Sequence, residues 1–159
     1  MTIGDNMFRK CLLLVFIVLS TGCDNNPPSD LVVGVDPSDA DMNDAMQHAV
    51  DTFPLFEANW KSIPNDGVGV KFAIPTSDGR FEFVWFEPLV IANNEIECIC
   101  ANDTIDTPGL KLGDRRVFST QDVKDWVIFD GNKCFGGYTM RVMAKIDPEF
   151  VPAFEFLDF

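Results

Sequence analysis

The chain has 159 residues, a formal net charge of −13, and an aromatic content that includes 15 phenylalanines and 3 tryptophans. This length suits one domain and is short for two. The excess of acidic side chains disfavours nucleic acid and anionic lipid head groups as partners, because like charges repel. It suits solubility, cations or a basic protein partner.

The chain begins with a predicted secretory signal that stops at a cysteine. Arg9 and Lys10 precede an apolar run over 11–19. That run is shorter than the roughly 20 apolar residues that cross a bilayer, and it fits the apolar region of a signal peptide. Three small residues and then Cys23 follow. The pattern resembles the lipobox of bacterial lipoproteins, which implies cleavage before Cys23 and acylation of its thiol and new amine. The alternative is an ordinary cleavage site with an incidental cysteine.

We therefore expect a signal peptide over 1–22 and a flexible tether over 23–38 that begins with the lipidated Cys23. The membrane is then a partner through the acyl chains, each buried methylene contributing about 0.8 kcal/mol. Asp24 resembles the inner-membrane retention signal of enterobacterial lipoproteins, so the expected location is the cell envelope, facing the periplasm. Loss of one acidic and two basic residues with the signal makes the mature net charge −14.

A helix is predicted to begin after an N-cap at Asp39. Apolar residues then recur at helical spacing: Met42, Ala45, Met46, Ala49, Val50 and Phe53. Pro54 is expected to break or kink this helix, with one more turn before Pro64. His48 falls on the opposite, polar face, so we predict that it is solvated and not catalytic.

From residue 67 onward apolar residues alternate, which indicates β-strands. Strands are expected over 68–74, 81–86, 95–100, 112–118, 126–129 and 138–143, with a helical turn over 120–122 and a hairpin turn over 130–133. The strand over 81–86 is apolar on nearly both faces and is expected inside the sheet. The predicted fold class is α+β: one amphipathic helix packed on a mainly antiparallel sheet of five to six short strands. The domain spans 39–148, and an aromatic tail over 149–159 is expected to pack against it.

Three cysteines remain after the signal and the lipidated residue: Cys98, Cys100 and Cys134. Cys98 and Cys100 face the same side of a strand, so either could form a disulfide with Cys134, but not both. A Cys-x-Cys metal site would need further ligands, and His48 is the only histidine. We predict no metal and no cofactor.

The second half of the chain carries a specific pattern: Lys111, Gly113, Asp114 and Arg115, then Asp122, Val123, Asp125 and Trp126, then Gly136 to Val142. It resembles the YegJ-like domain of unknown function, which occurs in bacterial proteins including lipoproteins. The opening helix, Lys71 and the strand over 82–85 also match, although Phe83 stands where a histidine is frequent. The resemblance covers about residues 36–148. It implies the fold and no activity.

Within this motif the candidate site residues are Asp114, Asp125, Trp126, Tyr138 and Arg141. Gly113 and the pair Gly136-Gly137 permit backbone turns. We expect Asp125 and Arg141 to pair across neighbouring strands, with Trp126 and Tyr138 packed over the core. The alternative is a binding patch made of the same residues.

The sequence contains no glycine-rich phosphate loop, no metal-ligand cluster and no nucleophile–base pair. We therefore predict a non-enzymatic binding module held at the envelope. One alternative is an immunity-type protein that blocks a toxin there, since an acidic surface attracts basic partners. The other is a hydrolase that uses carboxylates among Glu82, Glu87, Glu95 and Glu97.

Overall fold

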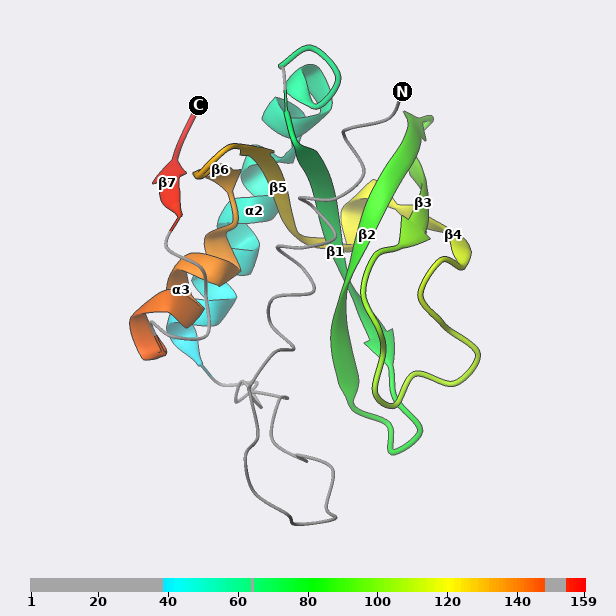
Figure 1. Ribbon diagram of the computed structural model, residues 1–159. Coiled ribbons are helices and arrows are strands. Elements are labelled where there is room, and N and C mark those ends of the chain that lie inside the picture. Colours follow the sequence, from blue (N-terminus) through cyan, green and yellow to red (C-terminus); the bar gives the residue numbers. More distant parts are fainter. Residues whose placement is uncertain (1–38, 64, 148–153) are drawn as a thin grey trace, which may run out of the picture.

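The computed structural model describes residues 39–63, 65–147 and 154–159. The elements in chain order are α2 (Ala40–Asn59), β1 (Gly67–Pro75), β2 (Phe81–Ala92), β3 (Glu95–Cys100), β4 (Arg115–Ser119), the 3-10 turn η2 (Thr120–Asp122), β5 (Val123–Asp130), β6 (Lys133–Gly136), α3 (Tyr138–Ile146) and β7 (Glu155–Leu157) (Figure 1). The predicted signal peptide, Cys23 and the tether lie outside the described residues.

The strands form one sheet of seven in the order β4-β3-β2-β1-β5-β6-β7. Neighbours pair antiparallel except β6 and β7, which are parallel. The predicted α+β class is confirmed, while the sheet is mixed and has more strands than expected. β2 lies inside it, between β3 and β1, as predicted.

Helix α2 begins where the sequence predicts, because the Asp39 side chain accepts a hydrogen bond from the backbone N–H of Met42 at 3.1 Å. Of the predicted break or kink at Pro54, the break does not occur, since the helix runs through Pro54 to Asn59. Pro54 removes one helical hydrogen bond. Phe53 and Phe56 on either side of it are buried, and each contributes roughly 1.5–3 kcal/mol, which offsets that loss.

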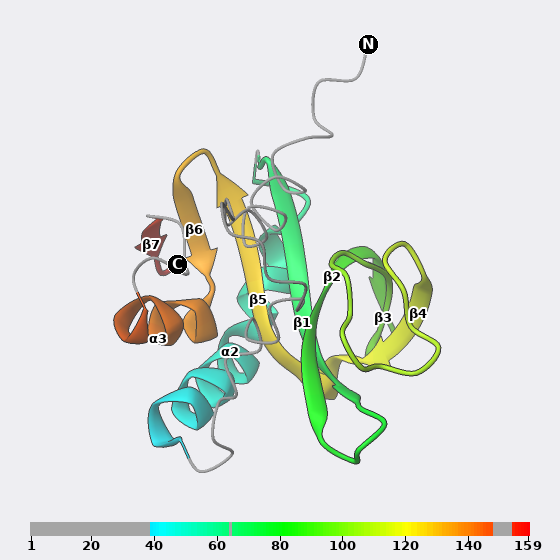
Figure 2. The ribbon, with the colours of Figure 1, turned by 60° about the horizontal axis from the view of Figure 1, so that its bottom comes forward.

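The sheet curves strongly at its β4 side, and this curvature closes the main core. Flat strands three positions apart would lie about 14 Å from one another. Yet Phe118 of β4 stacks on Phe72 of β1 with 4.1 Å between ring centroids. Figure 2 shows β2, β3 and β4 curling away from the plane of β1 and β5. The rings of β1, β2 and β4 thus pack together on the face that α2 covers.

The predicted hairpin after β5 is confirmed, but its second strand is β6, and the predicted strand over 138–143 is wrong. Gly136 and Gly137 both have positive φ, +75° and +62°, and they turn the chain out of the sheet. Helix α3 follows directly, with Tyr138 and Val142 buried at helical spacing. Apolar residues also alternate over 138–143, so the apolar period alone does not distinguish a helix from a strand there.

Both helices lie on the β5–β7 side of the molecule, as Figures 1 and 2 show. A second, smaller core forms there from Val127, Phe129 and Cys134, against which Trp85, Met140, Phe154 and Phe156 pack. The expectation that the aromatic tail packs on the domain is therefore confirmed for residues 154–159. Within the described residues, no helix is both long and apolar enough to span a bilayer.

Candidate functional site

A β-bulge brings a lysine and an aspartate side by side in the middle of the sheet. Lys71 pairs with Asp125 across β1 and β5, whereas its neighbour Phe72 pairs with Val123, which leaves Lys124 as the extra residue. Without the bulge Val123 and Asp125 would share a face, because they are two apart. With it, Val123 enters the main core and Asp125 turns to the opposite face beside Lys71.

Asp125 is fully buried and its carboxylate is saturated with donors. One oxygen accepts from the backbone N–H groups of Trp126, at 2.8 Å, and Tyr138, at 3.1 Å. The other accepts from the backbone N–H of Thr139 at 2.9 Å and from its hydroxyl at 2.5 Å. Gly137 precedes α3 without a side chain to cap it, so Asp125 supplies that cap from β5.

Lys71 completes this buried cluster. Its Nζ donates to the Thr139 hydroxyl at 2.5 Å and lies 4.4 Å from the centroid of the Trp85 ring. Burial lowers the pKa of Lys71, and the nearby Asp125 carboxylate opposes that shift. Burial also raises the pKa of Asp125, opposed by the charge of Lys71 and by the hydrogen bonds from Thr139 and Trp126. The two charges thus make each other's burial tolerable.

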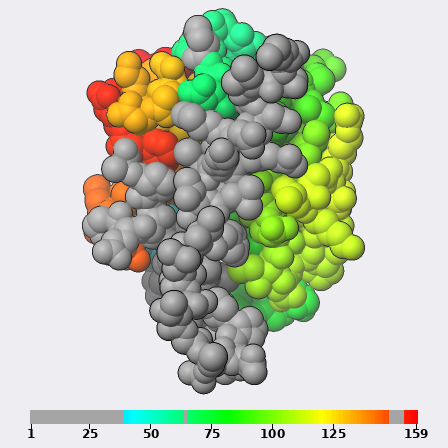
Figure 3. Space-filling model, viewed as in Figure 1, coloured from blue at the N-terminus to red at the C-terminus, as the bar shows by residue number. Residues whose placement is uncertain are grey.

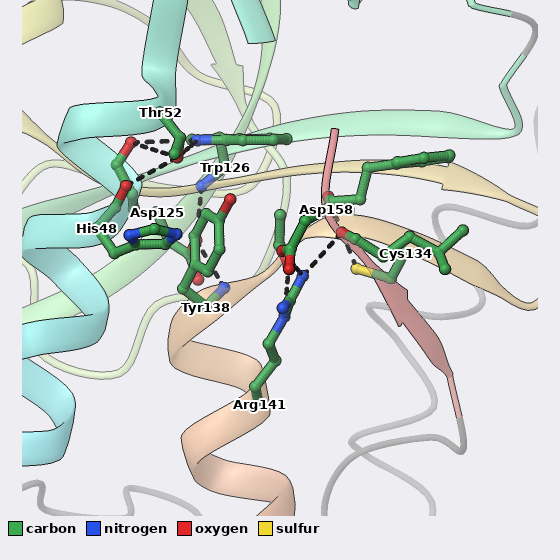
Figure 4. Close-up of polar contacts among 12 residues, drawn as sticks. His48, Thr52, Asp125, Trp126, Cys134, Tyr138, Arg141 and Asp158 are labelled. Atoms are coloured by element: carbon green, nitrogen blue, oxygen red, sulfur yellow. Dashed lines mark hydrogen bonds and ion pairs between the residues drawn. The ribbon is translucent and has the colours of Figure 1, made fainter. Parts of the chain in front are cut away.

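Tyr138 joins this cluster to α2 (Figure 4). Its ring meets His48 edge-on at 4.5 Å between centroids and Trp126 edge-on at 5.7 Å. The Trp126 Nε1 in turn donates to the Ala49 carbonyl at 3.1 Å and to the Thr52 hydroxyl at 3.2 Å. His48 is exposed, as the sequence predicts, but it packs on Tyr138 and is not simply solvated.

Arg141 does not pair with Asp125, so that prediction is wrong. Because residues 138–143 are helical, Arg141 points from α3 toward the C-terminal tail. Its guanidinium donates to the carbonyls of Gly136 at 3.1 Å and Leu157 at 2.8 Å, and it forms an ion pair with Asp158 at 2.9 Å. It also lies over the Tyr138 ring at 4.8 Å.

Asp114 lies apart from the other motif residues, in the turn that leads into β4. Its carboxylate accepts from the Lys111 backbone N–H at 3.1 Å and from Arg116 at 3.2 Å. Gly113 before it has φ of +87°, as expected for a glycine turn. The structure therefore brings together Asp125, Trp126, Tyr138 and Arg141, and Asp114 organises a separate loop.

Among the four candidate carboxylates of a hydrolase, Glu82 lies apart, whereas Glu87, Glu95 and Glu97 lie on one face of the paired strands β2 and β3. Glu82 accepts from the backbone N–H groups of Ile105 and Asp106. Glu97 forms a surface ion pair with Arg115 at 2.9 Å. Glu87 and Glu95 are exposed.

The cysteines do not form the disulfide that the sequence left open. Cys98 and Cys100 are buried free thiols, so neither is bonded to Cys134, which is also buried. Burial raises the pKa of Cys98 to about 12, which makes the thiolate scarce at neutral pH. Among the described residues no group of three or more His, Cys, Asp or Glu side chains could hold a metal ion.

A strip of aromatic side chains lies on strand β2, on the face opposite the main core. Phe81, Phe83 and Trp85 alternate along β2 and therefore share one face, on the side that Lys71 occupies. Phe81 is 62% exposed and Phe83 is 41% exposed. We call these three residues the aromatic strip.

Sequence reasoning missed Lys71 and Thr139 as partners of Asp125, and it missed the contacts of the tail. The alternation over 68–74 could have indicated Lys71. It places this lysine on one strand face between two small residues, Gly69 and Ala73. The polar groups of this cluster bond to one another. Asp125 has no free oxygen to act as a base, and the Thr139 hydroxyl belongs to a residue that is 3% exposed.

Comparison with known protein families identifies the family of this chain. A family model described as "Uncharacterized protein conserved in bacteria (DUF2314)" matches residues 39–147. The chain belongs to this family. It is similar to the uncharacterized protein YegJ of Escherichia coli strain K12, with 26% identity over 141 residues, which cover 89% of this chain and 92% of that protein. No solved structure matches the chain significantly.

Proposed function

We propose that this family member is a lipid-anchored protein of the bacterial cell envelope that acts as a non-enzymatic binding module. The anchor is argued from the sequence pattern that ends at Cys23, with Asp24 favouring the inner membrane. The binding role is argued from the aromatic strip. The net charge of −13 favours a partner with basic groups around its contact surface.

The exposed aromatic strip is the observation that carries the binding role. Monomeric proteins rarely leave large contiguous apolar surfaces in water, and aromatic residues are enriched in protein interfaces. Phe81 and Phe83 could bury substantial apolar area against a partner, because they are 62% and 41% exposed. Trp85 continues the strip toward β1, where its ring centroid lies 4.4 Å from the Lys71 ammonium.

The arrangement of polar groups supports binding over catalysis. A general base needs a free lone pair within reach of a substrate. The Asp125 carboxylate instead accepts four internal hydrogen bonds. None of the remaining candidate carboxylates, Glu82, Glu87, Glu95 and Glu97, is buried. The burial that sets one carboxylate apart from another as acid and base is therefore missing among them.

Site-specific photocrosslinking in the native envelope tests the binding role. A photoreactive phenylalanine analogue at Phe83 should form a discrete crosslinked adduct. The matched control is the same analogue at Glu57, which is exposed on α2. Adducts from Phe83 and not from Glu57 would support the proposal. Equal crosslinking at both positions, or none at Phe83, would contradict it.

Membrane fractionation tests the anchor separately. The Cys23→Ser variant should leave the membrane fraction or accumulate as an uncleaved precursor, since the acylated thiol would be absent. Normal maturation with unchanged membrane association would rule out the lipoprotein assignment and leave the binding role untouched.

A further inference from the structure

The C-terminal tail is seated on the domain as an added edge strand. β7 pairs in parallel with β6, with Cys134 opposite Phe156. The Glu155 backbone N–H donates to the Asn132 carbonyl at 2.8 Å, just before the pairing begins. Figure 3 shows the red tail at the molecular surface next to the β5–β6 hairpin. The edge of β6 therefore accepts an extended segment.

Two aromatic side chains of the tail fit separate places along this edge. Phe156 packs into the second core, near Cys134 and Val127. Phe159 stacks on Phe135 at 5.0 Å and on Trp126 at 5.9 Å between centroids. Yet Phe159 remains 46% exposed, so its ring lies at the molecular surface and is not enclosed in the core.

Arg141 provides the polar contacts of the same tail. It contacts the tail through the Leu157 carbonyl, the Asp158 carboxylate and the Phe156 ring, whose centroid is 5.4 Å away. The Gly136 carbonyl holds the guanidinium from behind. The Asp158 side chain is 67% exposed, so this ion pair is open to water and exchangeable.

We propose that this β6 edge, with Phe135, Trp126 and Arg141 beside it, is a peptide-binding site that the chain's own tail fills until a partner displaces it. The tail shows which chemistry the site accepts: an extended segment with an aromatic residue, a spacer, an acidic residue and a second aromatic residue, as in Phe156 to Phe159. Strand addition gives backbone hydrogen bonds, and alternate side chains give specificity. The ligand is a partner protein segment with this aromatic–acidic pattern. The site is distinct from the aromatic strip, so either could fail without the other.

The tail competes with any added peptide because it is covalently attached to the domain. Attachment gives it an effective concentration on the order of millimolar, so a free peptide of equal contacts binds the wild-type protein weakly. Weakening the tail's own contacts, with the β6 edge left intact, should therefore raise the affinity for an added peptide.

The test uses the full chain and a fluorescent peptide with the sequence of residues 155–159. The Asp158→Ala/Phe159→Ala variant should bind this peptide at least about tenfold more tightly than wild type in an anisotropy titration. Adding Arg141→Ala should remove that gain. The matched control is Val117→Ala, on the distant β4, which should bind like wild type. A peptide with both phenylalanines changed to alanine should not bind.

A folded double variant that binds the peptide no better than wild type would overturn the proposal. If the double variant does not fold, hydrogen exchange of the wild-type protein tests the proposal instead. Saturating peptide should speed the exchange of the backbone amides in residues 155–159, because it displaces them from β6. Unchanged exchange of those amides under the same conditions would also overturn the proposal.

Discussion

The two sides of the sheet use their aromatic residues in opposite ways. On the β5–β7 side, Trp126 is 1% exposed and contacts rings from α2, α3 and the tail. On the β2–β4 side, Phe81 is 62% exposed and Phe83 is 41% exposed. Four of the five candidate motif residues, Asp125, Trp126, Tyr138 and Arg141, gather on the first side and contact one another. The comparison indicates that these four residues stabilise the fold, and the contact surface proposed for Phe81 and Phe83 lies on the other side.

Their charges differ in the same way. Lys71 and Asp125 are buried together in the sheet, where an unpaired charge is costly. The Arg115–Glu97 pair of the β3–β4 region has side chains that are 68% and 40% exposed. Exposed pairs contribute about 0–1 kcal/mol. Substitutions should therefore cost most stability near Asp125 and least near β3 and β4.

The largest effect is expected for Gly136→Ala. An added Cβ would overlap the carbonyl oxygen and the ring of Trp126, and φ is +75°. The free energy of unfolding should fall by more than about 3 kcal/mol in urea unfolding. Gly131→Ala is the control, because φ there is +60° but the space is open. It should cost only about 1–2 kcal/mol. Equal losses at both positions would show that a Cβ at residue 136 does not clash with Trp126.

Lys71 and Asp125 should be energetically coupled. Asp125→Ala or Lys71→Met alone leaves a buried charge without its partner and should cost about 3–5 kcal/mol. The double variant should cost less than the sum of the two by about 1.5 kcal/mol or more. A double-mutant cycle on urea unfolding measures this coupling. Strict additivity would show that the two charges do not sense each other.

Arg141→Ala should have an intermediate effect. It removes a side chain that bonds two backbone carbonyls and Asp158, so the loss should be about 1–3 kcal/mol. Lys145→Ala, on the exposed side of α3, should change stability by less than about 0.5 kcal/mol. A loss for Arg141→Ala no greater than for this control would mean that the tail adds no stability.

His48→Ala should cost only about 0.5–1.5 kcal/mol, the value of an aromatic pair beyond its burial. The reason is its edge-on contact with Tyr138, since the residue is otherwise exposed. Asp44→Ala, also exposed on α2, is the control for helix propensity. A loss above about 2 kcal/mol would place His48 in the core.

Long periodic segments could be predicted from the sequence, and tertiary features could not. Helix α2 and strands β1 and β2 follow apolar periods that extend over many residues. Residues 138–143 fit both periods, so the choice of helix depends on the glycine turn and the cap from Asp125. The bulge at Lys124 is a one-residue shift between paired strands. Only that pairing shows that Asp125 faces Lys71. The helical geometry of α3 is what directs Arg141 toward the tail.

The division between a stabilising side and an exposed contact side is tested most directly by one measurement: the free energy of unfolding of Asp125→Asn next to that of the Phe81→Ser/Phe83→Ser double variant. Asp125→Asn should lose about 2–4 kcal/mol, because an amide nitrogen replaces an acceptor oxygen within a buried donor cluster. The double variant should lose less than about 1 kcal/mol, since Phe81 is 62% exposed and Phe83 is 41% exposed. A loss in the double variant equal to or greater than that in Asp125→Asn would contradict the account.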